Sequence, residues 1–263
     1  MVLLAAYAGL VGLVIGSFGN VVVARLPAGG SLVTPASHCP HCSNAIRARH
    51  NVPLLGWLVL RGRCADCRGR ISARYPLVEL GTAVLFVAVT LRLDRIDLLP
   101  ALPAYLYIGA AGLVLALIDL DSRRLPDSIV LPSYVVLAVL LVAASAWRHE
   151  WADLERAAAA GAALYCFYFA IAFAYPAGMG FGDVKLSGLL GGVLGYLSWG
   201  SLLVGAFAGF LLGSIVGVAV MAFWGGTRKT ALPFGPFMIA GALVGIFAGD
   251  ALAGVYLRLA TRA

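Results

Sequence analysis

The feature that most constrains this chain is a series of long segments without a charged side chain. Val2 to Ala24 contains no charged residue, and neither does Leu186 to Thr227, a run of 42 residues. A helix that crosses the hydrocarbon core of a bilayer needs about 20 consecutive apolar residues. Only 12% of the residues are charged, whereas a soluble domain carries about 25%. The sequence therefore predicts an all-α polytopic membrane protein.

The uncharged segments predict about eight transmembrane helices. The first, residues 1–24, precedes the first basic residue, Arg25, so it is expected to be retained with its amino end outside. The 42-residue run is long enough for two crossings. A weaker span is expected near Tyr75 to Leu91, where Glu79 would snorkel to the interface or bond to a neighbouring helix. The remaining spans are Leu98 to Ile118, Ser128 to Trp147, Ala157 to Gly182 and Thr230 to Gly249.

The distribution of Lys and Arg predicts the orientation, because these residues collect in cytoplasmic loops. Eight of them lie in one segment from Arg25 to Arg74, and the predicted orientation rests mainly on that segment. The net charge of +7 is interpreted as this topological signal and as attraction to anionic lipid, not to nucleic acid. The predicted cytoplasmic set is Arg25, Arg47, Arg49, Arg61, Arg63, Arg68, Arg70, Arg74, Arg123, Arg124, Lys185, Arg228 and Lys229, and the outer set is Arg92, Arg95, Arg148, Arg156, Arg258 and Arg262.

The segment from Arg25 to Arg74 also contains two C-x2-C pairs, formed by Cys39 with Cys42 and by Cys64 with Cys67. Two such pairs can supply four thiolates to a tetrahedral zinc ion. Two disulfides are the alternative, but they seldom persist in the reducing cytosol. Because this polar segment has too few apolar residues for a core of its own, zinc would stabilise its fold. His38 and His41 flank the first pair and are expected to be solvated, since four sulfurs complete the coordination shell.

Two acidic residues are candidates for chemistry at the membrane. Asp119 is expected to end the third span and Asp183 the fifth, so both would reach the cytoplasmic face. Charged groups at membrane depth are costly and therefore indicate function. Two carboxyls in one site can act as an acid and a base, as in aspartyl proteases, and glycines 178, 180 and 182 would permit close backbone approach beside the second acid. The residues alone leave a protease and an ion or solute transporter equally open, and a zinc-organised scaffold is a third class.

The other acidic residues have structural interpretations. Asp127 is expected to be the N-cap of the fourth span, because it follows Pro126 and precedes an uncharged segment. Asp121 lies two positions from Asp119 and could pair with a neighbouring arginine. Asp250 is expected at the outer interface. Composition alone does not favour Asp119 over Asp121 as the candidate for chemistry.

Several segments together resemble the type IV prepilin peptidases, membrane aspartyl proteases of the GxGD group. The resemblance covers nearly the whole chain and includes both cysteine pairs. Its segments are G-S-F-G-N-V-V-V-A-R-L-P from Gly16, N-V-P-L-L-G-W and R-G-R-C between the cysteine pairs, R-Y-P-L-V-E-L from Arg74, D-L-D-S-R-R-L-P-D from Asp119, G-F-G-D-V-K from Gly180 and P-F-G-P-F from Pro233.

The resemblance implies an activity and a set of site residues. Asp119, seven residues before the proline of the L-P-D motif, and Asp183, the GxGD aspartate, would be the catalytic pair. The substrates would be prepilins and pilin-like secretion subunits, whose short basic leader is removed at the cytoplasmic face of the inner membrane. Many members also N-methylate the new terminus with S-adenosylmethionine, an activity associated with the cysteine-bearing loop. Supporting roles beside the pair are expected for Gly180, Gly182, Lys185 and Pro126.

The predicted organisation has three parts. Residues 1–24 form the first transmembrane helix, residues 25–74 a cytoplasmic zinc-binding loop and residues 75–263 a seven-helix peptidase core. The metal ligands are expected to be Cys39, Cys42, Cys64 and Cys67, and the zinc to be structural, since four thiolates leave no position open for water. The expected partners are prepilin precursors and the lipid bilayer.

Overall fold

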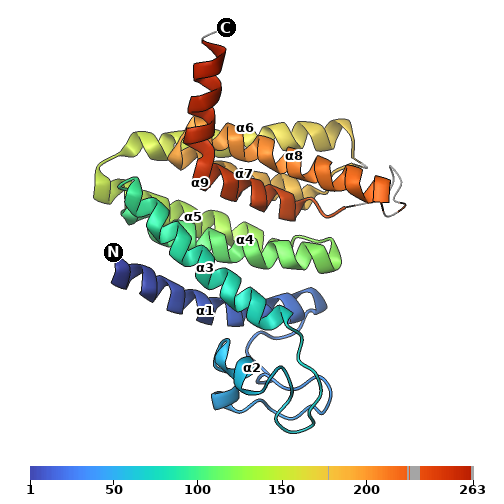
Figure 1. Ribbon diagram of the computed structural model, residues 1–263. Coiled ribbons are helices and arrows are strands. Elements are labelled where there is room, and N and C mark those ends of the chain that lie inside the picture. Colours follow the sequence, from blue (N-terminus) through green and yellow to red (C-terminus); the bar gives the residue numbers. More distant parts are fainter. Residues whose placement is uncertain (177, 224, 226–231, 262–263) are drawn as a thin grey trace. The chain divides into compact units, whose positions relative to one another are not determined.

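The computed structural model describes residues 1–176, 178–223, 225 and 232–261 (Figure 1). Across these residues the chain forms nine α-helices and no β-strand, which confirms the predicted all-α class. The helices divide between two compact units, Met1–Leu102 and Pro103–Ala263. The predicted boundaries at residues 24 and 74 stay a prediction.

The first unit consists of two long helices and the cysteine-rich segment that connects them. α1 (Val2–Arg25) packs along α3 (Arg74–Arg95), and the connection carries the short α2 (Leu55–Val59) (Figure 1). A Cβ added to Gly12 of α1 would lie 2.7 Å from the Cα of Ala83 in α3. Glycine at this position therefore lets the two helix backbones approach closely, a mode of packing common in membranes.

The second unit is a bundle of six helices, in which α6 packs on α7 and α8 packs on α9 (Figure 1). Small residues again permit the contact: a Cβ on Gly241 of α9 would lie 2.4 Å from the backbone nitrogen of Gly209 in α8. The helices are α4 (Leu102–Ser122), α5 (Asp127–Arg148), α6 (Trp151–Ala174), α7 (Phe181–Leu197), α8 (Trp199–Phe223) and α9 (Gly235–Ala260).

Seven helical segments in the described residues are long and apolar enough to cross a membrane. α7 is not among them, because it has only 17 residues, and it is the most deeply buried helix of its unit. With α7 as a short eighth helix, the pattern agrees with about eight predicted spans. The ends Thr227 and Thr230 of two predicted spans lie outside the described residues, as do Arg228, Lys229 and Arg262 of the predicted charge distribution.

The predicted fifth span, Ala157 to Gly182, is wrong at its carboxyl end. α6 ends at Ala174, and a turn separates it from α7, which begins at Phe181. A Cβ on Gly178 in this turn would lie 2.1 Å from Cδ1 of Tyr175, so a larger residue here would require that exposed ring to move. Asp183 therefore begins the sixth long helix of the chain and does not end the fifth.

The carboxyl end of α7 is held by an arginine of α6. Arg156 donates from Nε to the carbonyl oxygen of Gly195 at 2.6 Å and from Nη2 to that of Tyr196 at 2.8 Å. Its guanidinium also pairs with Asp153, with 2.8 Å between Nη2 and Oδ1. The last carbonyls of a helix have no partner within the helix. The arginine supplies donors to these carbonyls, so that α7 can end after 17 residues.

Candidate active site and metal centre

The first candidate acid, Asp119, lies in the last turn of α4 and is buried, with 5% of its surface exposed. Its Oδ2 accepts a hydrogen bond from the backbone N–H of Gly235, at 3.0 Å. Gly235 is the first residue of α9, where the N–H groups lack partners within the helix and the helix dipole favours a negative charge. The amino end of α9 therefore compensates in part for the burial of this carboxylate.

The second candidate acid, Asp183, lies in the first turn of α7. Its backbone N–H donates to the carbonyl oxygen of Gly180, the N-cap residue, at 3.0 Å. The first turn of a helix favours an acidic side chain electrostatically. The carboxylates of Asp183 and Asp119 are close enough for their charges to interact. Two residues 64 positions apart in the sequence thus meet in one site.

Leu125 packs between the helix ends that form this site. A Cβ on Gly182 would lie 3.0 Å from the Cβ of Leu125, and one on Gly235 would lie 3.4 Å from its Cδ2. A Cβ on Gly235 would also lie 2.8 Å from Oδ2 of Asp119, closer than normal atomic contact. The two glycines allow the amino ends of α7 and α9 to approach the segment that follows α4.

The predicted supporting residues lie around the same helix ends. Nζ of Lys185 donates to both carboxylate oxygens of Asp127 at 2.8 Å, and it lies 5.1 Å from the ring centroid of Phe181. Pro126 is the N-cap of α5, and its carbonyl accepts from the N–H of Val130 at 3.1 Å. A Cβ on Gly180 would lie 3.4 Å from Oδ2 of Asp183, so this glycine is less constrained by space than Gly182.

Two expectations for the other acids are corrected by these contacts. Asp127 is not the N-cap of α5 but its first residue, and its carboxylate pairs with Lys185 instead of capping the helix. Glu79 does not snorkel: it is buried, and its Oε2 accepts from the backbone N–H of Leu54 in the cysteine-rich segment, at 2.7 Å. Asp121 is exposed at the end of α4, unlike Asp119 two positions earlier.

Sequence reasoning did not assign a role to Gly235 or Leu125. Gly235 lies in the P-F-G-P-F segment that contributed to the resemblance, and this was the available signal. Its contact with Asp119 spans 116 positions, and a backbone N–H carries no side-chain pattern that would reveal it.

The four predicted metal ligands converge in the cysteine-rich segment. The sulfurs of Cys39, Cys42, Cys64 and Cys67 all lie within 4.8 Å of one another, and none of these cysteines is in a disulfide. The Sγ atoms of Cys39 and Cys67 are 3.8 Å apart. A tetrahedral zinc with Zn–S bonds of about 2.3 Å separates its sulfurs by about 3.8 Å. The cluster therefore fits a four-thiolate metal site.

Both cysteine pairs adopt the same local structure. In the first, the N–H of Cys39 donates to the carbonyl of Asn44 at 2.9 Å, and the N–H of Ser43 returns to the carbonyl of Cys39 at 2.9 Å. In the second, Cys64 bonds in the same way to Gly69 at 2.8 Å and to Arg68 at 3.1 Å. Two copies of one turn thus present their sulfurs to a common point.

Backbone N–H groups favour the thiolate at one of these sulfurs. Hydrogen bonds from the backbone of Cys42 and then of His41 lower the pKa of the Cys39 thiol to about 6. The pKa of the neighbouring Cys42 thiol is instead raised to about 12, because a backbone hydrogen bond from Asn44 is outweighed by burial and the side chains of the other three cysteines. Thiolate is the form that binds metal. In the described residues the metal-ligand cluster contains no histidine; Nδ1 of His38 lies 3.2 Å from the carbonyl oxygen of Ala36 instead.

Comparison with known proteins matches both halves of the chain. The bacterial peptidase A24 N-terminal domain matches residues 10–93, and the type IV leader peptidase family matches residues 106–218. Among similar proteins are three named prepilin leader peptidase/N-methyltransferase. The protein from Pseudomonas putida is 34% identical over 92% of this chain and 90% of its own length. The one from Burkholderia pseudomallei (strain 1026b) is 36% identical over 93% and 85%, and the one from Aeromonas hydrophila is 34% identical over 94% and 92%. No solved structure matches the chain.

The two matches cover the cysteine-rich segment and the region that contains both candidate acids, and the relatives align over nearly the full length. Family membership favours a protease over the transporter and the scaffold that the residues alone left open. The chain belongs to the type IV leader peptidase family.

Proposed function

We propose that this protein is an aspartyl endopeptidase that removes the leader from prepilins and pilin-like secretion subunits, with Asp119 and Asp183 as its catalytic pair. The observation that carries the proposal is the meeting of these two carboxylates at three helix ends, one of them held by the N–H of Gly235. The relatives' printed name, prepilin leader peptidase/N-methyltransferase, supports both this activity and N-methylation of the new terminus.

In the proposed mechanism the two carboxyls work as an acid and a base. One carboxylate takes a proton from a water molecule, which attacks the carbonyl carbon of the scissile bond. The other carboxyl protonates the carbonyl oxygen, and the roles then reverse to protonate the leaving amine. Two like charges at close range favour the singly protonated pair that this cycle requires.

The cysteine cluster is proposed to hold a structural zinc ion. Four sulfurs fill a tetrahedral shell, so zinc would stabilise the connection between α1 and α3. This shell leaves no position for a water molecule, so zinc would have no part in the proposed peptide cleavage. The methyl donor for the proposed N-methylation would be S-adenosylmethionine.

The proposed location is the bacterial inner membrane, with the cysteine-rich segment and both acids on the cytoplasmic side. The positive-inside rule supports this placement mainly through the cysteine-rich segment. In the first unit the cysteine-rich segment carries most of the arginines, and in the second Arg123 and Arg124 directly follow the helix that carries Asp119. The prepilin would reach the site from the bilayer.

The test is cleavage of a co-expressed prepilin, followed by the change in mass or gel mobility. Asp119→Asn and Asp183→Asn are expected to abolish cleavage at wild-type expression. Asp121→Asn is the matched control, because it makes the same change at an exposed position two residues away. Loss of cleavage in Asp121→Asn with retention in Asp119→Asn would refute the assignment of the pair.

A further inference from the structure

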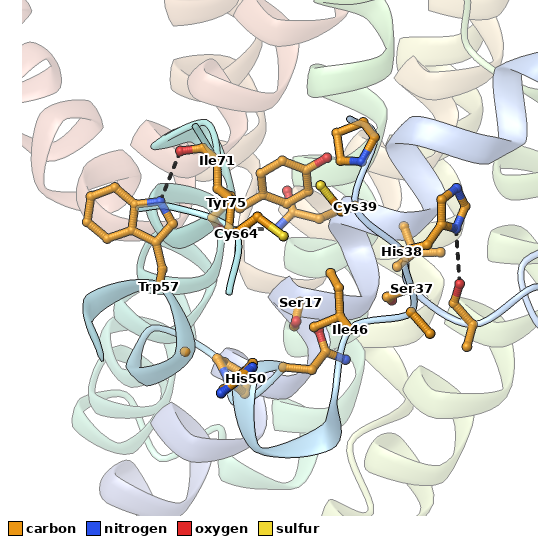
Figure 2. A pocket seen from close by; sticks show the side chains of 18 of the residues that line it. Ser17, Ser37, His38, Cys39, Ile46, His50, Trp57, Cys64, Ile71 and Tyr75 are labelled. Carbon is orange, nitrogen blue, oxygen red and sulfur yellow. Dashed lines mark hydrogen bonds between the residues drawn. The ribbon is translucent and has the colours of Figure 1, made fainter. Parts of the chain in front are cut away.

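The first unit contains a cavity lined entirely by its own residues. The cavity has a volume of about 930 Å³ and lies between α1, α3 and the cysteine-rich segment (Figure 2). Ligand pockets commonly measure about 300–1,000 Å³. Val14 and Phe18 of α1 supply apolar lining, while Trp57 and Tyr75 add aromatic rings. Figure 2 shows Trp57 and Tyr75 among the lining residues, together with the metal-centre residue Cys64.

The notable group in the lining is the carboxylate of Glu79, with only 8% of the residue exposed. Its Oε2 accepts the backbone N–H of Leu54 at 2.7 Å. Among the described residues, no donor bonds to its other oxygen, Oε1, and no Lys or Arg forms a salt bridge with it. A buried carboxylate is costly unless a cation or several hydrogen bonds compensate for the lost water.

Several other polar groups of the lining bond within the protein. Nδ2 of Asn20 donates to the carbonyl of Tyr75 at 3.1 Å, and Nε1 of Trp57 donates to that of Ile71 at 3.2 Å. Asp66, the other acid of the lining, pairs with Arg47 at 3.2 Å. Three arginines, Arg25, Arg47 and Arg70, also line the cavity, but Arg47 is held by Asp66 and Arg25 donates to the carbonyl of Ser31 at 3.1 Å. Among the described residues Glu79 is the acid of the lining without a cationic partner, and the group that its carboxylate suits carries a positive charge and hydrogen-bond donors.

We propose that the cavity binds a primary α-ammonium group, with Oε1 of Glu79 as its counter-charge. The inference rests on the proposed N-methylation, in which two reactants carry such a group. One is the amino-acid end of S-adenosylmethionine, and the other is the new amino terminus of the cleaved polypeptide. An ammonium group carries three N–H donors and a compact positive charge. It would therefore supply Oε1 of Glu79 with both a hydrogen bond and an opposite charge.

The experiment compares ligands that carry the ammonium group with ligands that lack it. It uses the purified full-length protein with its metal bound. The first pair is S-adenosylhomocysteine and 5′-methylthioadenosine, which lacks the amino-acid end. The second pair is a peptide with the sequence of the mature amino terminus and the same peptide with an acetylated terminus. Equilibrium binding of all four is measured for the wild type, Glu79→Gln and Glu79→Asp.

Glu79→Gln keeps an oxygen for the N–H of Leu54 but removes the charge. It is expected to weaken binding of the ammonium-bearing member of one pair about tenfold or more, the effect of losing a charged hydrogen bond. Binding of the member without the ammonium should not change, and Glu79→Asp should restore part of the preference. Asp97→Asn is the matched control, since it removes the same charge from an exposed position of the same unit.

The pair that responds identifies the source of the ammonium. A response of the nucleoside pair assigns the site to the methyl donor, and a response of the peptide pair assigns it to the acceptor. Equal effects of Glu79→Gln on both members of each pair, or no preference for the ammonium in the wild type, would overturn the proposal. Metal content and unfolding temperature show whether each variant is folded. If a variant does not fold, the preference of the wild type for the ammonium-bearing ligand still tests the proposal.

Methylation of the cleaved product is measured separately by mass spectrometry. An ammonium preference that depends on Glu79 in a protein that does not methylate would refute the proposed N-methylation while supporting this site. Methylation by a wild type that shows no ammonium preference would support the proposed N-methylation and refute this site.

Discussion

Replacement of Gly235 by alanine is expected to impair cleavage by displacing Asp119. The added Cβ would lie 2.8 Å from Oδ2 of Asp119, whereas carbon and oxygen in weak contact are about 3.3–3.6 Å apart. The carboxylate would have to withdraw by about 0.5 Å or more. Its hydrogen bond to the N–H of Gly235, now 3.0 Å long, would then be largely lost.

A hydrogen bond to a charged group contributes about 1.5–3 kcal/mol. Since about 1.4 kcal/mol changes a rate tenfold, kcat should fall about 10- to 150-fold. The assay is steady-state cleavage of a purified prepilin, with thermal unfolding measured on the same samples.

Gly254→Ala is the matched control for this variant. Gly254 lies on the same helix, and a Cβ there would meet no atom within 4 Å. This control should cleave normally, and alanine should slightly favour the helix. If a folded Gly235→Ala protein cleaves at the wild-type rate, the contact between α9 and Asp119 does not position the catalytic carboxylate.

Three further predictions concern stability and the metal. Cys39→Ser should lose bound zinc and make the cysteine-rich segment sensitive to protease, whereas Cys166→Ser, outside the metal cluster, should not; metal analysis and limited proteolysis measure this. Arg156→Ala should lower the free energy of unfolding by about 1–3 kcal/mol, because it leaves the last carbonyls of α7 without their donor, while Asp153 keeps its ion pair with Arg148; an unchanged midpoint in chemical denaturation would contradict this. Asp127→Ala should cost at most about 1 kcal/mol, since the side chain is 55% exposed and its pair with Lys185 is screened by water; a larger shift in thermal unfolding would show that the pair stabilises the site more than its exposure suggests.

The parts that could be predicted from the sequence depend on local patterns. The long uncharged segments indicated membrane helices because their length is tied to bilayer thickness. The spacing of Cys39, Cys42, Cys64 and Cys67 indicated a metal site, because each pair is a local turn that presents two sulfurs. Asp119 and Asp183 were selected by the resemblance, since residues alone did not separate Asp119 from Asp121.

Two of the errors concern the ends of helices. Apolar character continues from α6 through the turn at Gly178, so hydropathy extended the fifth span to Gly182. The structure ends α6 at Ala174, shortly before Pro176, and proline disfavours helical backbone in the residue that precedes it, which hydropathy does not record. Asp127 was interpreted as a cap because its partner, Lys185, is 58 residues away.

The sequence by itself determined that this chain is a helical membrane protein with a tetracysteine insertion, because both follow from short-range composition and spacing. Only the tertiary structure decided that α7 is a short helix whose end is held by Arg156, and that Asp119 receives the N–H of Gly235. It also decided that Glu79 is buried beside a cavity, with one oxygen that receives no hydrogen bond from any described residue. These features depend on groups brought together across tens to more than a hundred positions, and no local pattern encodes such a meeting.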